Sequence, residues 1–314
     1  MELYLLACER VENGGGIYRY DFAEGNLRQT GYFPCDRPMY AVKKGNCLHL
    51  LLRAPFEGSE ISGYTTLTDF STLSELVPTS GVCACHLAVE DDAAYFVNYL
   101  SGNVVKSDGS CVCHTGNGPH KTRQTAPHTH FTTVTPDKKF VLVTDLGLDT
   151  VFTYDRDLRF IDKAKVPEGY GVRHLVFSKD GKTVFAVNEL VPSVSAFWYE
   201  DGRLTYRYTV DIPCKVKDST AAAIRLSDDG KYLFVSVRGE NSLHSFEMKE
   251  NGLQEICRTH SDGDFPRDIE LIDDKYLVVC NERSPYASVF GVQNGKITEV
   301  LDRTEIPACL NCVK

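Results

Sequence analysis

Histidine, arginine and carboxylate side chains recur in this sequence at the ends of short apolar runs, where they could share one site. His128 and His130 stand two positions apart, and Arg173, Glu189 and Arg238 follow further along the chain. Imidazole and carboxylate groups exchange protons near neutral pH, whereas guanidinium stays charged and binds carboxylate or phosphate. This combination indicates a site where a small anionic molecule undergoes proton transfer or acyl chemistry.

A repeated unit of about 45 residues fixes the positions of these side chains, and a period of this length is typical of propeller blades. Each copy has a short β-rich run, a polar turn around Asp and a second β-rich run, and a third run follows. The turn residues, spaced 45, 43, 49 and 45 residues apart, are Asp92, Asp137, Asp180, Asp229 and Asp274. A weaker copy lies at 40–53. No long segment has helical periodicity, so the chain is expected to be all-β.

Six copies are visible, and the length of 314 residues leaves room for a seventh. Runs at 3–9, 16–22 and 26–33 could form three strands of this unit, and 306–314 could supply its innermost strand. We therefore predict a seven-bladed β-propeller, a single domain over 1–314, whose last blade is closed by strands from both termini. A two-sheet sandwich is the competing fold, but the single repeated unit favours the propeller.

The phase of the repeat places the polar side chains at one end of the predicted central channel. The first strand of a blade starts, and the second ends, at the same mouth. The catalytic candidates occupy these positions, together with five further residues expected to bind substrate, namely His86, Asp145, His174, Arg267 and Asn281. The opposite strand ends carry only turn residues, so one mouth is the predicted site.

Structural roles compete with this interpretation at several positions. The two histidines at 128 and 130 could be hydrogen-bonded structural residues. Arg173 and Arg267 could form ion pairs with Glu189 and Asp268 that hold adjacent blades together. Glu189 and Glu282 follow Asn at the same position of the repeat, so one of the two is expected to be structural. The convergence of many such residues, rather than any single one, favours a functional site.

Composition limits the classes of partner. A net charge of -9 argues against a nucleic-acid or membrane-surface binder, which needs a basic face. No stretch reaches the roughly 18 apolar residues of a spanning helix, and the N-terminus lacks a basic leader. A cytoplasmic monomer or weak homodimer that acts on a small anionic lactone or carboxylate is the expectation.

Metal binding is not expected, nor is a cofactor. The twelve cysteines include close pairs at 83 and 85, 111 and 113, and 309 and 312, with His86 and His114 beside the first two. A zinc site would need such pairs to converge, whereas buried reduced thiols are more common. A calcium-dependent propeller hydrolase would need carboxylate and amide oxygens around the axis, without competing arginines.

Four segments resemble the propeller lactonases, the family of cycloisomerase-type 6-phosphogluconolactonases and 3-carboxy-cis,cis-muconate lactonising enzymes. The matching segments are 127–155, 171–197, 224–246 and 265–282, with a looser match at 85–104. The resemblance implies that the family's functional positions correspond to His128, His130, Arg173, Glu189 and Arg238. The sequence departs from the family at 37–40, Arg-Pro-Met-Tyr for Asn-Pro-Ser-Tyr, and at 236–238, Ser-Val-Arg for Ser-Asn-Arg.

The resulting hypothesis is a metal-independent lactonase that hydrolyses 6-phosphogluconolactone or a related aldonolactone. Arg173 and Arg238 would hold the anionic group or stabilise the oxyanion. Glu189, or one of the histidines at 128 and 130, would take the proton from the attacking water. The alternatives are a muconate-type lactonising enzyme (a cycloisomerase), which would share the arginines, and a non-catalytic propeller scaffold. The common scaffold signatures, Gly-His and Trp-Asp in each blade, are absent from the sequence.

Overall fold

The computed structural model describes residues 1–90, 92–250 and 252–314, and nearly all of its regular structure is antiparallel β-sheet. The chain forms two compact units. Unit 1 contains residues 1–38 and 212–314, and unit 2 contains residues 39–211. Unit 1 contributes three sheets and unit 2 four, which together are the blades of the predicted seven-bladed β-propeller. The assignment of 1–314 to a single domain stays a prediction.

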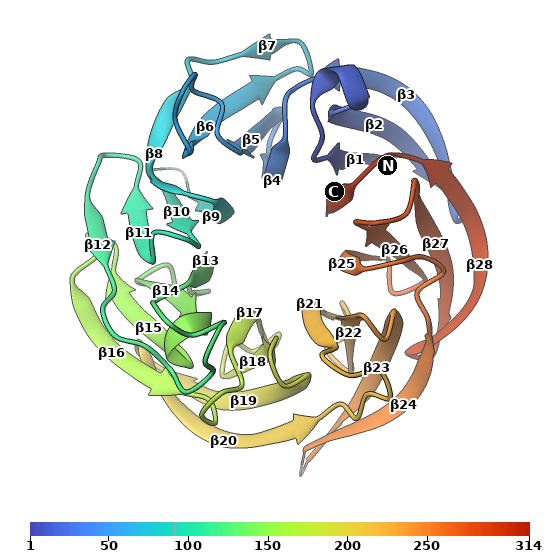
Figure 1. Cartoon of the computed structure of the whole chain (residues 1–314). Helices are drawn as coiled ribbons and strands as arrows, with labels where there is room; N and C mark the ends of the chain where they lie inside the picture. The colour runs from blue at the N-terminus through green and yellow to red at the C-terminus, as the bar shows by residue number, and fades with distance from the viewer. Residues whose placement is uncertain (91, 251) are drawn as a thin grey trace. The chain divides into compact units, whose positions relative to one another are not determined.

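Unit 2 holds four consecutive blades (Figure 1). Blade 1 consists of β4 (Pro38–Lys44), β5 (Cys47–Leu52), β6 (Ile61–Thr68), β7 (Thr72–Leu73) and β8 (Val77–Val82), which pairs with β6. Blade 2 consists of β9 (Ala84–Val89), β10 (Ala94–Asn98), β11 (Asn103–Lys106) and β12 (Cys111–Cys113). Blade 3 consists of β13 (Thr129–Val134), β14 (Phe140–Asp145), β15 (Thr150–Asp155) and β16 (Phe160–Lys165), with the 3-10 turn η2 (Leu146–Leu148) after β14. Blade 4 consists of β17 (Val172–Phe177), β18 (Thr183–Asn188), β19 (Ser193–Glu200) and β20 (Arg203–Asp211).

Unit 1 holds two blades of consecutive strands and one that both chain ends complete. Blade 5 consists of β21 (Thr220–Leu226), β22 (Tyr232–Arg238), β23 (Ser242–Lys249) and β24 (Gly252–His260). Blade 6 consists of β25 (Pro266–Ile272), β26 (Tyr276–Asn281), β27 (Tyr286–Gln293) and β28 (Lys296–Glu305). The closing blade consists of β29 (Cys309–Val313), β1 (Glu2–Ala7), β2 (Gly16–Ala23) and β3 (Asn26–Pro34), with the 3-10 turn η1 (Val11–Asn13) before β2.

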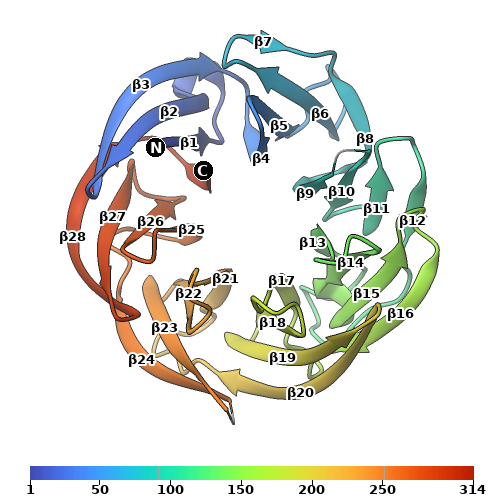
Figure 2. The ribbon, with the colours of Figure 1, turned by 180° about the vertical axis from the view of Figure 1, so that it is seen from behind.

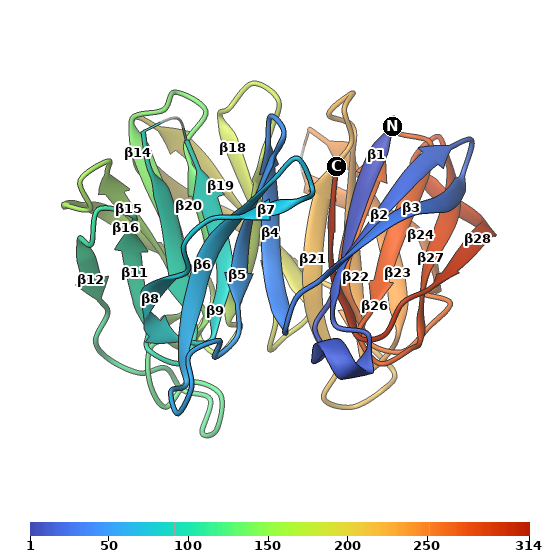
Figure 3. The same ribbon diagram turned by 90° about the horizontal axis from the view of Figure 1, so that it is seen from above.

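The closing blade confirms the predicted pairing of the two termini. Leu5 pairs with Tyr18 on one side and with Cys312 on the other, both antiparallel. Figure 3 shows both chain ends at the same end of this blade. The C-terminal strand therefore occupies the edge position, here called the inner strand, that β4, β9, β13, β17, β21 and β25 take in the other blades.

Burial follows the strand position within each blade. The second strands are almost wholly buried, as in β10 and β14, because their apolar side chains pack on both faces of the sheet. The fourth strand alternates between covered and exposed residues, as β28 does, because it forms the outer edge of its blade. The core is therefore a set of layers between adjacent blades, such as the layer that joins Leu142, Ala186 and Phe197.

A β-bulge near the start of the inner strand recurs from blade to blade. One extra residue on the inner strand interrupts its pairing with the next strand, and in five blades the register identifies it as Cys85, His130, Arg173, Arg267 and Leu310. Blade 5 has the same irregularity between Ala221 and Ile224. A bulge redirects side chains and commonly lies beside functional sites. Three of the predicted site residues occupy these bulge positions.

Within the residues that the structure describes, no helix has the length and apolar character needed to cross a membrane.

Candidate functional site

Three histidines from consecutive inner strands lie together in unit 2. His86 lies on β9, His130 on β13 and His174 on β17, and each is only 5% exposed. The ring centroids of His86 and His174 are 5.3 Å apart, and those of His130 and His174 are also 5.3 Å apart. The repeat placed these residues at equivalent strand starts, and the structure brings their rings into one cluster.

His128 lies just outside β13 with a defined hydrogen-bonding pattern. Its Nδ1 lies 2.9 Å from the carbonyl oxygen of Tyr99, which can only accept a hydrogen bond, so Nδ1 carries the proton. The lone pair of a neutral imidazole is then on Nε2. The Tyr99 ring stacks on His128 at 4.4 Å between centroids and meets His130 edge-on at 5.5 Å. Simple strand alternation does not relate the two histidines, because His130 is the bulged residue, but both contact the same aromatic ring.

A buried carboxylate connects two guanidinium groups in this unit. Glu189 accepts hydrogen bonds from Nε of Arg173 at 3.0 Å and from Nη2 of Arg123 at 2.5 Å. The side chains of Arg173 and Glu189 are 2% and 3% exposed, whereas that of Arg123 is 38% exposed. Nη1 of Arg173 also lies 3.1 Å from Nε2 of His174, which joins the ion pair to the histidine cluster.

Arg123 is the residue that the sequence reasoning missed. It lies in the segment between β12 and β13, where the repeat assigns no strand, and its sequence neighbours give no signal of a site. Its guanidinium also donates to the Tyr99 hydroxyl at 3.3 Å. Burial raises the pKa of Tyr99 above its ordinary value, so this phenol stays protonated at neutral pH. Arg123 opposes that rise in pKa through both its hydrogen bond and its positive charge.

Two residues expected to bind substrate are instead engaged with the protein itself. Asp145 has no exposed surface, and its oxygens lie 2.6 Å from Nδ1 of His114 and 2.8 Å from the backbone nitrogen of His128. Asn281 is also fully buried, and its Nδ2 is 3.5 Å from the carbonyl of Ser261. Both lie at the end of a second strand, as predicted, and their side chains brace the loop beside it.

In unit 1 the predicted arginines have defined neighbours. Nη1 of Arg267 lies 3.1 Å from Oε2 of Glu282, and this pair repeats the Arg173–Glu189 arrangement of unit 2. Arg238, which ends β22, donates to the carbonyl of Ala221 at 3.3 Å, and its guanidinium carbon lies 5.1 Å from the centroid of Phe265.

Asp268, the alternative partner considered for Arg267, is bound to other residues of unit 1. The oxygen Oδ1 of Asp268 instead accepts from Nη2 of Arg225 at 2.9 Å, and its other oxygen accepts from Asn311 at 2.8 Å. Nε of Arg225 donates to Glu270 at 2.8 Å. This network holds the inner strands β21, β25 and β29 of unit 1 together.

The donor sets considered for a metal ion do not assemble. Among the described residues, no three His, Cys, Asp or Glu side chains form a group able to hold one. His114 of the proposed zinc set is bound to Asp145, and the thiol of Cys85 points to the carbonyls of Thr129 and His130. The side-chain oxygen of Asn98, on β10 of blade 2, accepts from the hydroxyl of Thr79 on β8 of blade 1, and its nitrogen donates to Thr79 and to Asn103 of β11.

Comparison with known proteins gives a consistent result. A family model described as lactonase, 7-bladed beta-propeller matches residues 3–314. An uncharacterised protein of Staphylococcus aureus is 30% identical over 335 residues, which cover 96% of each chain. A crystal structure of a protein from Lactobacillus plantarum is 28% identical with a TM-score of 0.89, over 99% of this chain and 98% of that one. Another from Bacteroides fragilis, provisionally described as a 6-phosphogluconolactonase, is 25% identical with a TM-score of 0.87, over 99% and 97% of the two chains.

Proposed function

Because the chain belongs to the lactonase family of seven-bladed β-propellers, we propose that it hydrolyses a sugar lactone without a metal ion. The proposed substrate is 6-phosphogluconolactone or a related anionic aldonolactone. The observation that carries the mechanism is the fixed tautomer of His128, whose Nδ1 donates to the Tyr99 carbonyl and whose Nε2 keeps the lone pair. The provisional description of the Bacteroides fragilis structure supports the choice of substrate.

His128 acts as the general base in this proposal. Its side chain is only half-buried, so water can reach Nε2. As water adds to the lactone carbonyl, its proton moves to Nε2 and the carbonyl oxygen becomes an oxyanion. When the bond between the acyl carbon and the ring oxygen breaks, the imidazolium returns this proton to the leaving oxygen, and the ring opens to a hydroxy acid. His130 and His174, whose rings belong to the histidine cluster, orient the lactone.

Arg173 supplies the positive charge, and Glu189 fixes its position. A buried guanidinium stabilises an oxyanion or a phosphate more strongly than an exposed one because water screens it less. Both oxygens of Glu189 accept from guanidinium groups, so taking a proton from water would disrupt an ion pair. We therefore assign Glu189 to positioning and the base role to His128.

Arg238 keeps the functional position that the family resemblance implies. Arg238 is proposed to bind the anionic group of the substrate. The variant Arg238→Met tests this role. His86 and Arg267 are proposed as substrate-binding residues because the repeat places them at the starts of inner strands.

The test measures the rate of lactone opening above the spontaneous rate, with proton release as the signal. We expect His128→Gln to lower kcat by about 100- to 10,000-fold, the usual contribution of a general base. His260→Gln, a change of the same chemistry at an exposed histidine of unit 1, is the matched control and is expected to keep full activity. The assay should be repeated after treatment with a chelator, with 6-phosphogluconolactone and with the unphosphorylated lactone.

Each arm has an outcome that counts against the proposal. If neither lactone opens faster with enzyme, the lactonase function is wrong. If His128→Gln retains the wild-type kcat, the base is a different group. Loss of activity in the chelator contradicts metal independence. Loss of the ultraviolet absorbance of 3-carboxy-cis,cis-muconate, in the absence of lactone opening, would identify the muconate-type alternative.

A further inference from the structure

A cavity lies in unit 2 on the outer side of blades 2 and 3. Its volume is about 440 Å³, within the range of small-molecule sites. One wall is the end of β12 with the segment 113–117, and the other is the outer part of blade 3, residues 148–165. β12 and β16 are the outer strands of these blades, as Figure 2 shows. The cavity opens here because β12 is only three residues long, whereas β16 has six.

One face of blade 3 supplies an aromatic floor to this cavity. Phe152 and Tyr154 alternate along β15 and so share a face, and Tyr154 pairs across the sheet with Phe160 of β16. His114 lies 4.1 Å from the ring of Phe152, between centroids. His114 is held by Asp145 on Nδ1 and by the Tyr154 hydroxyl on Nε2, at 2.6 and 2.8 Å. The polar atoms of the floor are therefore already bonded, and its rings are left for stacking.

Two lysines stand beside this floor with the same orientation. Lys163 pairs across the sheet with Phe152, and Lys165 pairs with Thr150, so both side chains share the face of the aromatic rings. Both line the cavity and both are exposed. Within the part of the chain that the structure describes, neither ammonium group has an ion-pair or hydrogen-bond partner. Two like charges two residues apart repel each other, and an anion between them would relieve that repulsion.

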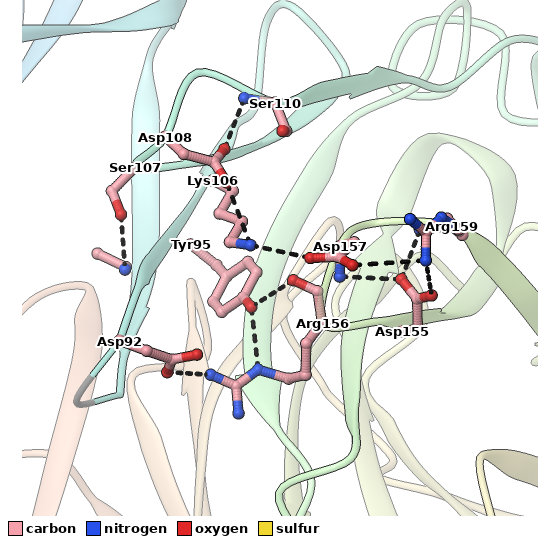
Figure 4. Close-up of polar contacts among 11 residues, drawn as sticks. Asp92, Tyr95, Lys106, Ser107, Asp108, Ser110, Asp155, Arg156, Asp157 and Arg159 are labelled. Carbon is pink, nitrogen blue, oxygen red and sulfur yellow. Dashed lines mark hydrogen bonds and ion pairs between the residues drawn. The ribbon is translucent and has the colours of Figure 1, made fainter.

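Blades 2 and 3 are joined by a polar network at the turn between β15 and β16 (Figure 4). The hydroxyl of Tyr95 donates to the carbonyl of Arg156 at 2.8 Å and accepts from its Nε at 3.0 Å. Lys106 of β11 reaches Asp157 at 3.2 Å, and Arg156 reaches Asp92 at 2.6 Å. Because blades 2 and 3 are joined here, the cavity between them is preformed and binding costs little reorganisation.

We propose that this cavity binds a flat aromatic anion, a ring that carries one carboxylate or phosphate group. The ring lies against Phe152 and Phe160, and the anionic group lies between Lys163 and Lys165. The aromatic floor provides stacking area and the lysines provide point charges that suit either anion. The cavity shares none of its lining residues with the histidine and arginine cluster, so this ligand differs from the proposed lactone substrate.

The test is calorimetric titration of the full-length protein with 2-naphthoate and, separately, with adenosine 5'-monophosphate. We expect saturable binding of at least one, and the tighter of the two identifies the anionic group. 2-Naphthalenemethanol, which lacks the charge, and cyclohexanecarboxylate, which lacks the flat ring, should each bind at least tenfold more weakly. Higher salt should weaken binding of the anion, because exposed charges are screened.

Three variants locate the site. The double substitution Lys163→Ala and Lys165→Ala should weaken binding at least tenfold, and Phe160→Ala should weaken it severalfold. The matched control is Lys215→Ala with Lys217→Ala, which removes two exposed lysines at the same spacing in unit 1 and should leave binding unchanged. Circular dichroism checks that each variant is folded. The proposal is overturned if neither probe binds, or if both lysine double variants bind as the wild type does.

Discussion

Glu189 and Glu282 offer a direct measurement of what burial contributes to the candidate site, because the repeat places them in equivalent ion pairs. Glu189 pairs with Arg173, and both side chains are at most 3% exposed. Glu282 pairs with Arg267, and the two side chains are 29% and 23% exposed. The prediction is that Glu→Gln, which keeps the shape of the side chain, is far more costly at Glu189 than at Glu282.

The magnitudes follow from the two environments. Removing one partner of a buried ion pair leaves a desolvated charge behind and costs about 3–5 kcal/mol. Both oxygens of Glu189 accept from guanidinium groups, so the amide nitrogen of Gln would also face a donor. A partly exposed pair such as that of Glu282 contributes about 0–1 kcal/mol, because water screens it. Arg123→Gln should cost about as little, since the Arg123 side chain is 38% exposed.

The assay is urea unfolding of the wild type and the three single variants, followed by circular dichroism, with the free energy of unfolding taken from each transition. We expect Glu189→Gln to lose about 2 kcal/mol or more beyond the loss of either other variant. Equal losses for Glu189→Gln and Glu282→Gln would refute the reasoning that burial, and not the ion pair as such, sets the contribution.

Three further predictions concern pH and the support of His128. Burial lowers the pKa of His244 below its ordinary value of 6.5, so the folded state holds the neutral imidazole. The free energy of unfolding should therefore be highest above pH 6.5 and fall from pH 7 to 5. Urea unfolding repeated across this range measures the dependence, and His244→Gln should flatten it. A Cβ on Gly147 would lie 2.0 Å from the carbonyl oxygen of Ala126 and 2.9 Å from the backbone nitrogen of His128. Gly147→Ala should therefore lower both the melting temperature and the kcat for the lactone. An unchanged kcat would show that the loop adapts. Asp145→Asn should cost about 1–3 kcal/mol in unfolding free energy, because one buried polar contact of the side chain is lost, and thermal unfolding that matches the wild type would contradict the bracing role.

The sequence predicted the fold well because the fold follows from a local repeat. The period gave strands that the structure shows, including a C-terminal inner strand in the closing blade. The same phase brought His86, His130 and His174 to equivalent positions, and the ring contacts between them confirm that these three lie together. Periodicity reports such positions because each depends only on its place within one unit.

The partners of those residues depend on contacts between segments far apart in the chain. Asp145 and Asn281 carry polar groups at the predicted strand ends, but the packing of nearby loops encloses them completely. Arg123 comes from a segment outside the repeat, so periodicity gave it no position. The anion cavity likewise results from the short strand β12 beside the aromatic face of blade 3, and neither feature alone indicates a site.

By itself, then, the sequence determined the all-β repeat, the blade closed by both termini and the list of side chains available for chemistry. The tertiary structure decided which ring nitrogen of His128 carries the proton, which arginine pairs with each carboxylate and which polar groups stay accessible. The bulges show the reason: one extra residue on an inner strand redirects His130 and Arg173 without changing the period of the repeat. Local patterns encode strands, whereas hydrogen bonding and burial depend on where the other strands lie.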